Sequence, residues 1–286
     1  NQNKKLEQKK KELQDFIARF SANASKSKQA TSRKKQLEKL QFEDMQISNR
    51  KYPYIEFKPE REAGNNMLKV ENLSKTVDGE KVIDNISFTI NTGDKVVILS
   101  NNDIAKTTLF QLLAGEIEPD EGKIEWGVTT SQSYFPKDNS KYFEGVDLSL
   151  IDWLRQFSND QHEEYVRGFL GRMLFSGEEA TKKAKVLSGG EKVRCMLSKM
   201  MLSNANVLLL DNSTDHLDLE SITSLNKSLE RFPGTILFTT HDHEFIQTIA
   251  NKIIEITPKG ILEKEMEYDD YLNDENVQEK LEEMYK

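Results

Sequence analysis

"VVILSNNDIAKTTLFQLLAG", residues 96–115, joins an apolar run typical of a buried strand to a segment with helical periodicity. Between a strand and a helix, the pattern G-x-x-x-x-G-K-[ST] forms a loop whose main-chain N–H groups bind phosphate. Lys106 and Thr107 stand at the last two positions of that pattern, but Ser100 and Ala105 replace its glycines. The stretch therefore predicts a strand, a phosphate loop of altered composition, and a helix.

The composition is that of a globular protein with an extensive polar surface. Charged residues make up 31% of the 286 residues and aromatic residues 8%, and no run approaches the ~18 apolar residues of a membrane span. The first residues have no apolar signal-peptide core. A single cysteine, Cys195, excludes a disulfide within the chain and is typical of a reducing compartment. We therefore expect a cytoplasmic protein of one or two domains with no membrane partner.

The first forty residues are basic and the remainder is acidic. Residues 1–40 carry twelve Lys/Arg against four Asp/Glu, while the whole chain has a net charge of −8. Apolar residues from Leu6 to Leu40, at spacings of three, four and seven, predict helix over 4–40 with a break within 20–32. Such a stripe suits an antiparallel helix pair or a coiled coil. A basic arm indicates an anionic partner, although a solvated charged helix gives the same composition.

After the arm, the sequence predicts a connector, a folded domain and a tail. Residues 47–66 contain two prolines and Gly64, and they predict an extended connector between an arm over 1–46 and a domain over 67–268. Strand-like and helix-like segments alternate in that domain and predict a mostly parallel, covered sheet. A hairpin is expected around Pro258–Gly260, and residues 269–286 predict an acidic helical tail. Since the arm begins without a cap or an initiator methionine, we expect a fragment.

Four short motifs follow one another in a specific order. After Lys106 come "LSGGEKVR" (187–194), "NVLLLDNSTDHLD" (206–218) and "ILFTTHD" (236–242), the last two being apolar strands that end in polar residues. Lys106, Ser188, Asp211 and His241 are separated by 82, 23 and 30 residues. Each motif alone is weak, but the ordered combination is specific. Polar residues at the ends of such strands lie where ligands bind in parallel sheets.

This combination resembles the nucleotide-binding domain of ABC ATPases, and more narrowly the C-terminal half of an ABC-F protein. The narrower resemblance depends on Glu191 after the two glycines, on "DHLDLESI" after Asp211, and on the basic stretch "FIARFSANASKSKQATSRKKQLEKL" (16–40). It extends from about residue 10 to residue 265. It implies an α/β fold with a RecA-like parallel core, an antiparallel β subdomain (67–93) and a helical subdomain (142–202), preceded by a helical arm.

The resemblance also implies the ligands ATP and Mg²⁺ and a role for each motif. Main-chain N–H groups would bind the phosphates at Asn101, Asn102, Asp103, Ile104, Ala105, Lys106, Thr107 and Thr108. Thr107 and Asp211 would hold Mg²⁺, and His241 would contact the γ-phosphate. Ser188, Gly189, Gly190 and Glu191 would clamp ATP bound to an opposite domain, with Asp215, His216 and Asp218 along the interface.

The partners implied by the resemblance are a first nucleotide-binding domain on the same full-length chain and the ribosome, with a dimer of this chain as an alternative. The arm would belong to the interdomain linker that reaches toward P-site tRNA. Its RNA-facing cations would be Arg19, Lys26, Lys28, Arg33, Lys34 and Lys35. Contacts of this kind with nucleic-acid phosphates depend strongly on salt.

The motifs depart from the family pattern at the nucleotide. Asn212 stands where the family has the glutamate that activates water, and a neutral amide cannot supply general-base help worth about 10²–10⁴-fold. Lys137 aligns with a glutamine, and no ring lies near Val77 for the adenine. Because Asn and Asp tolerate left-handed backbone, Asn101–Asp103 are expected to keep the loop shape. We expect degenerate motifs, weak ATP binding and little hydrolysis.

Three other functional classes fit parts of the pattern. The ATP-binding subunit of a transporter would not need a basic arm. A chromosome-maintenance ATPase would carry its helical arm between the nucleotide motifs, whereas here the arm precedes them. A nucleotide-silent partner domain differs from the leading interpretation only in its affinity for ATP.

Overall fold

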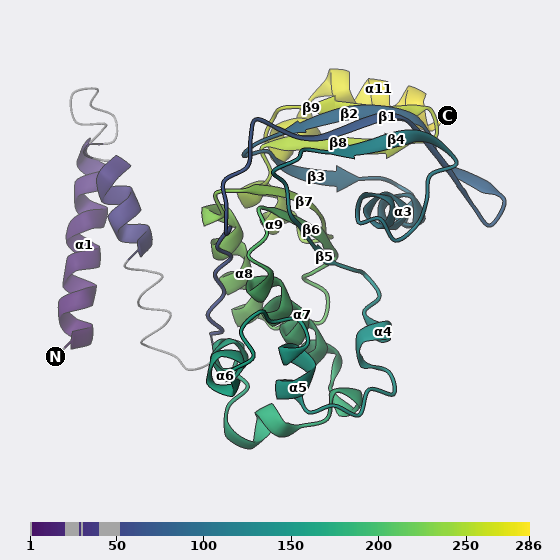
Figure 1. Cartoon of the computed structure of the whole chain (residues 1–286). Coiled ribbons are helices and arrows are strands. Elements are labelled where there is room, and N and C mark those ends of the chain that lie inside the picture. Colours follow the sequence, from purple (N-terminus) through teal and green to yellow (C-terminus); the bar gives the residue numbers. More distant parts are fainter. Residues whose placement is uncertain (1, 21–28, 30, 40–51) are drawn as a thin grey trace. The chain divides into compact units, whose positions relative to one another are not determined.

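The computed structural model describes residues 2–20, 29, 31–39 and 52–286 (Figure 1). Contacts along the chain divide it into two compact units, Asn1–Tyr54 and Ile55–Lys286. Each unit is described by itself.

The described residues of the first unit form a pair of helices. Helix α1 spans Gln2–Phe20, and residues 31–39 form a second helix beside it (Figure 1). Leu13 is buried, and the guanidinium of Arg33 lies 5.6 Å from the centre of the Phe16 ring. The predicted helix is confirmed for these residues, whereas most of the predicted break lies outside the described residues. The side chains of Arg19, Arg33, Lys34 and Lys35 are exposed, and Lys26 and Lys28 lie outside the described residues.

The main sheet of the second unit has six strands in the order β5-β6-β7-β3-β8-β9. The strands are β3 (Lys95–Leu99), β5 (Gln132–Phe135), β6 (Val207–Asp211), β7 (Thr235–Thr239), β8 (Lys252–Thr257) and β9 (Gly260–Lys264). All neighbours are parallel except β8 and β9, which form the predicted hairpin. Every residue of β6, β7 and β8 is buried, which confirms a mostly parallel, covered sheet.

A smaller antiparallel sheet has the order β2-β1-β4, with β1 (Asn66–Val77), β2 (Glu80–Asn91) and β4 (Glu121–Trp126). Its buried face shares one apolar cluster with helix α3 (Asp103–Leu113) and with one side of the main sheet. The indole N–H of Trp126 donates to the Leu113 carbonyl oxygen at 3.1 Å, which ties β4 to the end of α3. The antiparallel β subdomain is thereby confirmed.

The predicted helical subdomain is a set of short helices. These are α4 (Ser140–Phe143), α5 (Leu150–Arg155), α6 (Glu163–Arg172) and α7 (Gly189–Ser203), with 3₁₀ turns at Gly177–Thr181 and Ala184–Val186. Trp153 is fully buried and stacks on Phe143 with ring centres 5.0 Å apart. Helices α8 (Leu219–Arg231) and α9 (His243–Ile249) follow β6 and β7.

Both ends of the second unit pack against its core. Ile55 and Phe57 are buried, and the Phe57 ring meets Phe232 edge to face at 6.4 Å. Helices α10 (Tyr268–Asn273) and α11 (Glu275–Tyr285) bury Tyr271, Val277 and Leu281. Residues 269–286 therefore lie on the domain instead of extending from it. Within the described ranges, no helix has both the length and the apolarity to cross a lipid bilayer.

Candidate nucleotide site

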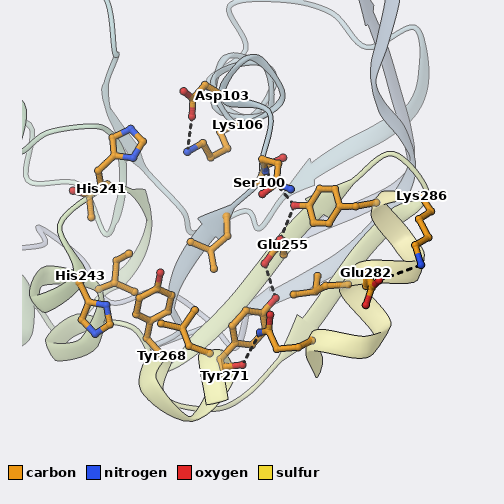
Figure 2. A pocket seen from close by; sticks show the side chains of 18 residues that line it. Ser100, Asp103, Lys106, His241, His243, Glu255, Tyr268, Tyr271, Glu282 and Lys286 are labelled. Atoms are coloured by element: carbon orange, nitrogen blue, oxygen red, sulfur yellow. Dashed lines mark hydrogen bonds and ion pairs between the residues drawn. The ribbon is translucent and has the colours of Figure 1, made fainter. Parts of the chain in front are cut away.

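The site lies where three neighbouring parallel strands end. Strand β7 pairs with both β3 and β6, so the loop after β3, Asp211 at the end of β6, and Thr239 at the end of β7 meet at one edge of the sheet. Figure 2 shows Asp103, Lys106 and His241 around one pocket of about 950 Å³. The topology thus brings together three of the four sequence motifs, those of Lys106, Asp211 and His241, whereas the fourth, at Ser188, begins α7.

The predicted backbone of the phosphate loop is wrong. Asn101, Asn102 and Asp103 are absent from the left-handed residues of the described chain. Asn102 has φ −108° and caps α3, its side chain accepting a hydrogen bond from the Ile104 amide at 3.0 Å. Asparagine is a preferred cap, and Asp103 in the first turn suits the positive end of the helix. Since no glycine opens the loop, the helix starts three residues before Lys106.

Four amides predicted to bind phosphate are already used within the chain. The Asn101 amide donates to the Tyr285 hydroxyl at 3.1 Å, and the Asn102 amide donates to the Ser100 hydroxyl, also at 3.1 Å. The Ile104 amide is held by the cap, and the Lys106 amide donates to the Asn102 carbonyl at 3.4 Å. In this conformation, therefore, the loop does not fit a triphosphate and the expected cradle is not formed.

Lys106 is also occupied. Its ammonium lies 2.9 Å from the Asp103 carboxylate, and its side chain is only 8% exposed. The hydrogen bond from Lys106 lowers the pKa of Asp103, and the charges of Lys137 and His241 act in the same direction. Asp103 therefore neutralises locally the cation that the sequence assigned to the terminal phosphates. Lys137 is exposed, and its charge acts to lower the pKa of both Asp103 and Asp211.

The oxygen atoms at the strand ends fit a magnesium ion. Burial raises the pKa of Asp211, opposed by a hydrogen bond with the Thr107 hydroxyl. Buried atoms Oδ2 of Asp211, Oδ1 of Asn212 and Oγ1 of Thr239 have no hydrogen-bond partner. Carboxylate and hydroxyl oxygens suit Mg²⁺, which usually also keeps water or phosphate ligands. Because the described chain holds no cluster of three or more His, Cys, Asp or Glu, such outside ligands would be needed.

Asn212 follows Asp211 and is buried. Its main-chain N–H donates to the Thr239 carbonyl oxygen at 3.0 Å. It has φ 55°, and His216 in the following loop has φ 65°. The sequence analysis did not predict a left-handed backbone at Asn212. Asparagine adopts this backbone at low cost.

The clamp segment is well formed at the N-terminus of α7. The Ser188 hydroxyl accepts from the Glu191 amide at 3.2 Å, and Glu191 accepts from the Ser188 amide at 3.1 Å. A Cβ at position 190 would lie 2.9 Å from the His216 carbonyl oxygen, so this position requires glycine. The structure thus places the clamp beside the predicted interface loop. Asp215 in that loop is exposed, and Asp218 caps α8 through the Ser221 amide at 2.8 Å.

Sequence reasoning missed the residues that face the phosphate loop from the other side. These are Glu255 in β8, Tyr271 in α10 and Tyr285 in α11. A single acid in the apolar strand "KIIEIT" is a detectable signal for Glu255. Nothing in the local pattern of the terminal helix distinguishes Tyr285.

The Asp211→Asn variant should be more stable than the wild-type protein at neutral pH. Burial raises the folded pKa of Asp211, so its ionised form lowers stability above the unfolded pKa and has no such effect below it. We expect the free energy of unfolding to rise by about 1–3 kcal/mol at pH 7, and this gain to fade toward pH ~4. Urea unfolding without Mg²⁺ measures both, with the exposed Asp215→Asn as control. A loss of stability at pH 7 would contradict the conclusion that burial destabilises the ionised Asp211 side chain.

Comparisons with known proteins agree with this arrangement. A family model described as ABC transporter matches residues 83–215, and a second with the same description, an extension of the first, matches residues 1–57. The uncharacterized ABC transporter ATP-binding protein YkpA of Bacillus subtilis (strain 168) is 64% identical over 99% of this chain and 53% of its own length. ABC transporter F family member 2 of Arabidopsis thaliana is 30% identical over 97% of this chain and 41% of its own.

Solved structures share the fold. A dimeric post-hydrolysis state of the ATP-binding cassette MJ0796, bound to ADP and Pi, has a TM-score of 0.58 at 18% identity and covers 70% of this chain and 99% of its own. The ADP conformation of MJ1267 has a TM-score of 0.56 at 19% identity, with 76% and 98% covered. The chain spans about half the length of the curated relatives it matches. Its helical arm, its ordered motifs and its mixed α/β domain together identify it as a member of the ABC-F type of ABC ATP-binding proteins.

Proposed function

We propose that this chain is the ATP-binding half of an ABC-F protein that binds nucleotide weakly, hydrolyses little, and clamps ATP held by another domain. One contrast carries the proposal. The clamp helix α7 has a complete capping box, and Gly190 lies against the His216 carbonyl. By contrast, the phosphate loop is closed on itself, and Asn212 after β6 stands where the family has its catalytic glutamate. This half therefore retains the clamp, which would contact ATP on a partner domain, while its own phosphate loop and its glutamate position are altered.

The surface around the clamp supports pairing with a second nucleotide-binding domain. Two apolar side chains are exposed there: Val186 just before the clamp (66%) and Leu219 after the interface loop (75%). Exposed apolar groups near one functional edge are typical of a contact surface. The relatives are about twice as long as this chain, which leaves room for the partner domain. Pairing of two copies of this chain is the alternative.

Action on the ribosome in the cytoplasm is supported by the arm. Its exposed cations belong to a stretch with a net charge of +8, and a helix of this kind would contact rRNA or tRNA phosphates. The acidic remainder of the chain would not bind RNA in this way. The nucleotide state of the paired domains would then be coupled to translation through this linker.

The steady-state ATPase rate of the chain tests the proposed weakness. At saturating Mg·ATP the chain should turn over no faster than its Lys106→Ala variant, because general-base help worth about 10²–10⁴-fold is missing and the loop is closed. Multiple turnovers that depend on Lys106 would contradict the proposal.

A further inference from the structure

The strongest polar network outside the expected nucleotide contacts surrounds Glu255. This carboxylate is 8% exposed and lies in β8, beside β3. The Tyr271 hydroxyl donates to its Oε1 at 2.8 Å, and the Tyr285 hydroxyl donates to its Oε2 at 2.6 Å. Burial raises the pKa of both tyrosines, so both remain protonated donors at neutral pH. Glu255 therefore fixes the position of the Tyr285 hydroxyl.

That hydroxyl is also a partner of the phosphate loop. It accepts the Asn101 amide at 3.1 Å, while the Ser100 hydroxyl donates to the Ile256 carbonyl oxygen at 2.8 Å. The first two residues after β3 are thus tied to α11 and β8. Glycine, the family residue at position 100, has no hydroxyl for the second contact.

Helix α11 packs against the apolar core of the second unit. Val277 and Leu281 are buried in the core, and Asp274 caps the helix by accepting the Val277 amide at 3.0 Å. Glu282 lines the same pocket as Lys106, beside Lys286, with which it forms an ion pair of 3.2 Å.

We propose that α11 is an autoinhibitory latch, in which Tyr285 holds the Asn101 amide and keeps the phosphate loop closed to nucleoside triphosphate. The proposal rests on the proposed function, since it regulates the same Lys106 site. Nucleotide binding then requires the Tyr285–Asn101 contact to break. The apparent dissociation constant is raised by the reciprocal of the open fraction, so a weaker latch means tighter binding.

Equilibrium binding of Mg·ATP to the complete chain tests the latch. Tyr285→Phe keeps the ring but removes the hydroxyl, and it should tighten binding by roughly three- to tenfold. Tyr268→Phe is the matched control, because Tyr268 lines the same pocket, whereas the Asn101 amide is bound by Tyr285. Ser100→Gly leaves α11 intact, and it should also tighten binding and add to the effect of Tyr285→Phe.

Amide hydrogen exchange gives a second measurement that does not depend on nucleotide. The Asn101 amide should exchange faster in Tyr285→Phe than in the wild-type chain, and at the wild-type rate in Tyr268→Phe. Tighter binding that is lost when Lys106→Ala is added, together with faster exchange, is the expected result.

Two other results would distinguish failure of the latch from failure of the proposed nucleotide site. If Lys106-dependent binding is present but equal in all the tyrosine variants, the latch is wrong and the proposed nucleotide site stands. If no variant, including the combined Ser100→Gly and Tyr285→Phe, shows Lys106-dependent binding up to millimolar Mg·ATP, both the latch and the nucleotide site are wrong.

Discussion

Asn212→Glu should raise the ATP turnover of this chain by about 10²–10⁴-fold when the phosphate loop carries Ser100→Gly, Asp103→Gly and Ala105→Gly, and by less than about tenfold without them. Glutamate supplies the proton acceptor that the amide lacks. It can act only on bound nucleotide, and in the present loop four amides and Lys106 are already engaged. The two sets of changes should therefore cooperate strongly.

Single-turnover hydrolysis at chain concentrations that allow two copies to pair measures this cooperation. Asn212→Gln in the same loop background is the control, because it has the length of glutamate without its basicity. A large gain from Asn212→Glu alone would show that the loop already holds ATP productively and would contradict the closed-loop account.

Most of the architecture could be predicted from the sequence. The two apolar runs that precede Asp211 and His241 can be recognised as strands in the sequence. Because these strands pair in parallel, the polar residues at their ends lie close together. Periodicity located the helices of the arm and of the domain. These features follow from burial patterns that the chain itself encodes.

The loop conformation was not predictable from the family pattern. Asn101, Asn102 and Asp103 were expected to imitate glycines, yet cap and dipole preferences gave a helix start instead. The local sequence permits either outcome. The choice is reinforced by Tyr285, which lies 184 residues away in sequence. Such contacts are set by tertiary packing, and no periodicity reports them.

Gly189→Asp should abolish the clamp function. Gly189 is exposed at the N-terminus of α7, and a Cβ there would meet the His216 ring at an ordinary 3.5 Å, so the domain should still fold. A carboxylate is favourable at a helix N-terminus but would repel the phosphate charge of an opposing nucleotide. We expect a loss of about 10²–10³-fold in turnover at the partner's site, comparable with removal of one preorganised donor.

The assay requires a partner domain, which a relative can supply. In a chimera, this chain replaces the matching half of the Bacillus subtilis relative, and the half of that relative that this chain does not cover serves as the proposed partner domain. Gly168→Asp is the matched control, because that glycine is exposed on α6 with nothing near its Cβ position.

The most direct test of the account compares two variants of this chimera in the ATPase assay. Lys106→Ala, which removes the cation of this half's own site, should leave turnover within about threefold, while Gly189→Asp should lower it by about 10²–10³-fold. The opposite result, with Lys106→Ala inactive and Gly189→Asp active, would show that this half works through its own nucleotide site and not through its clamp.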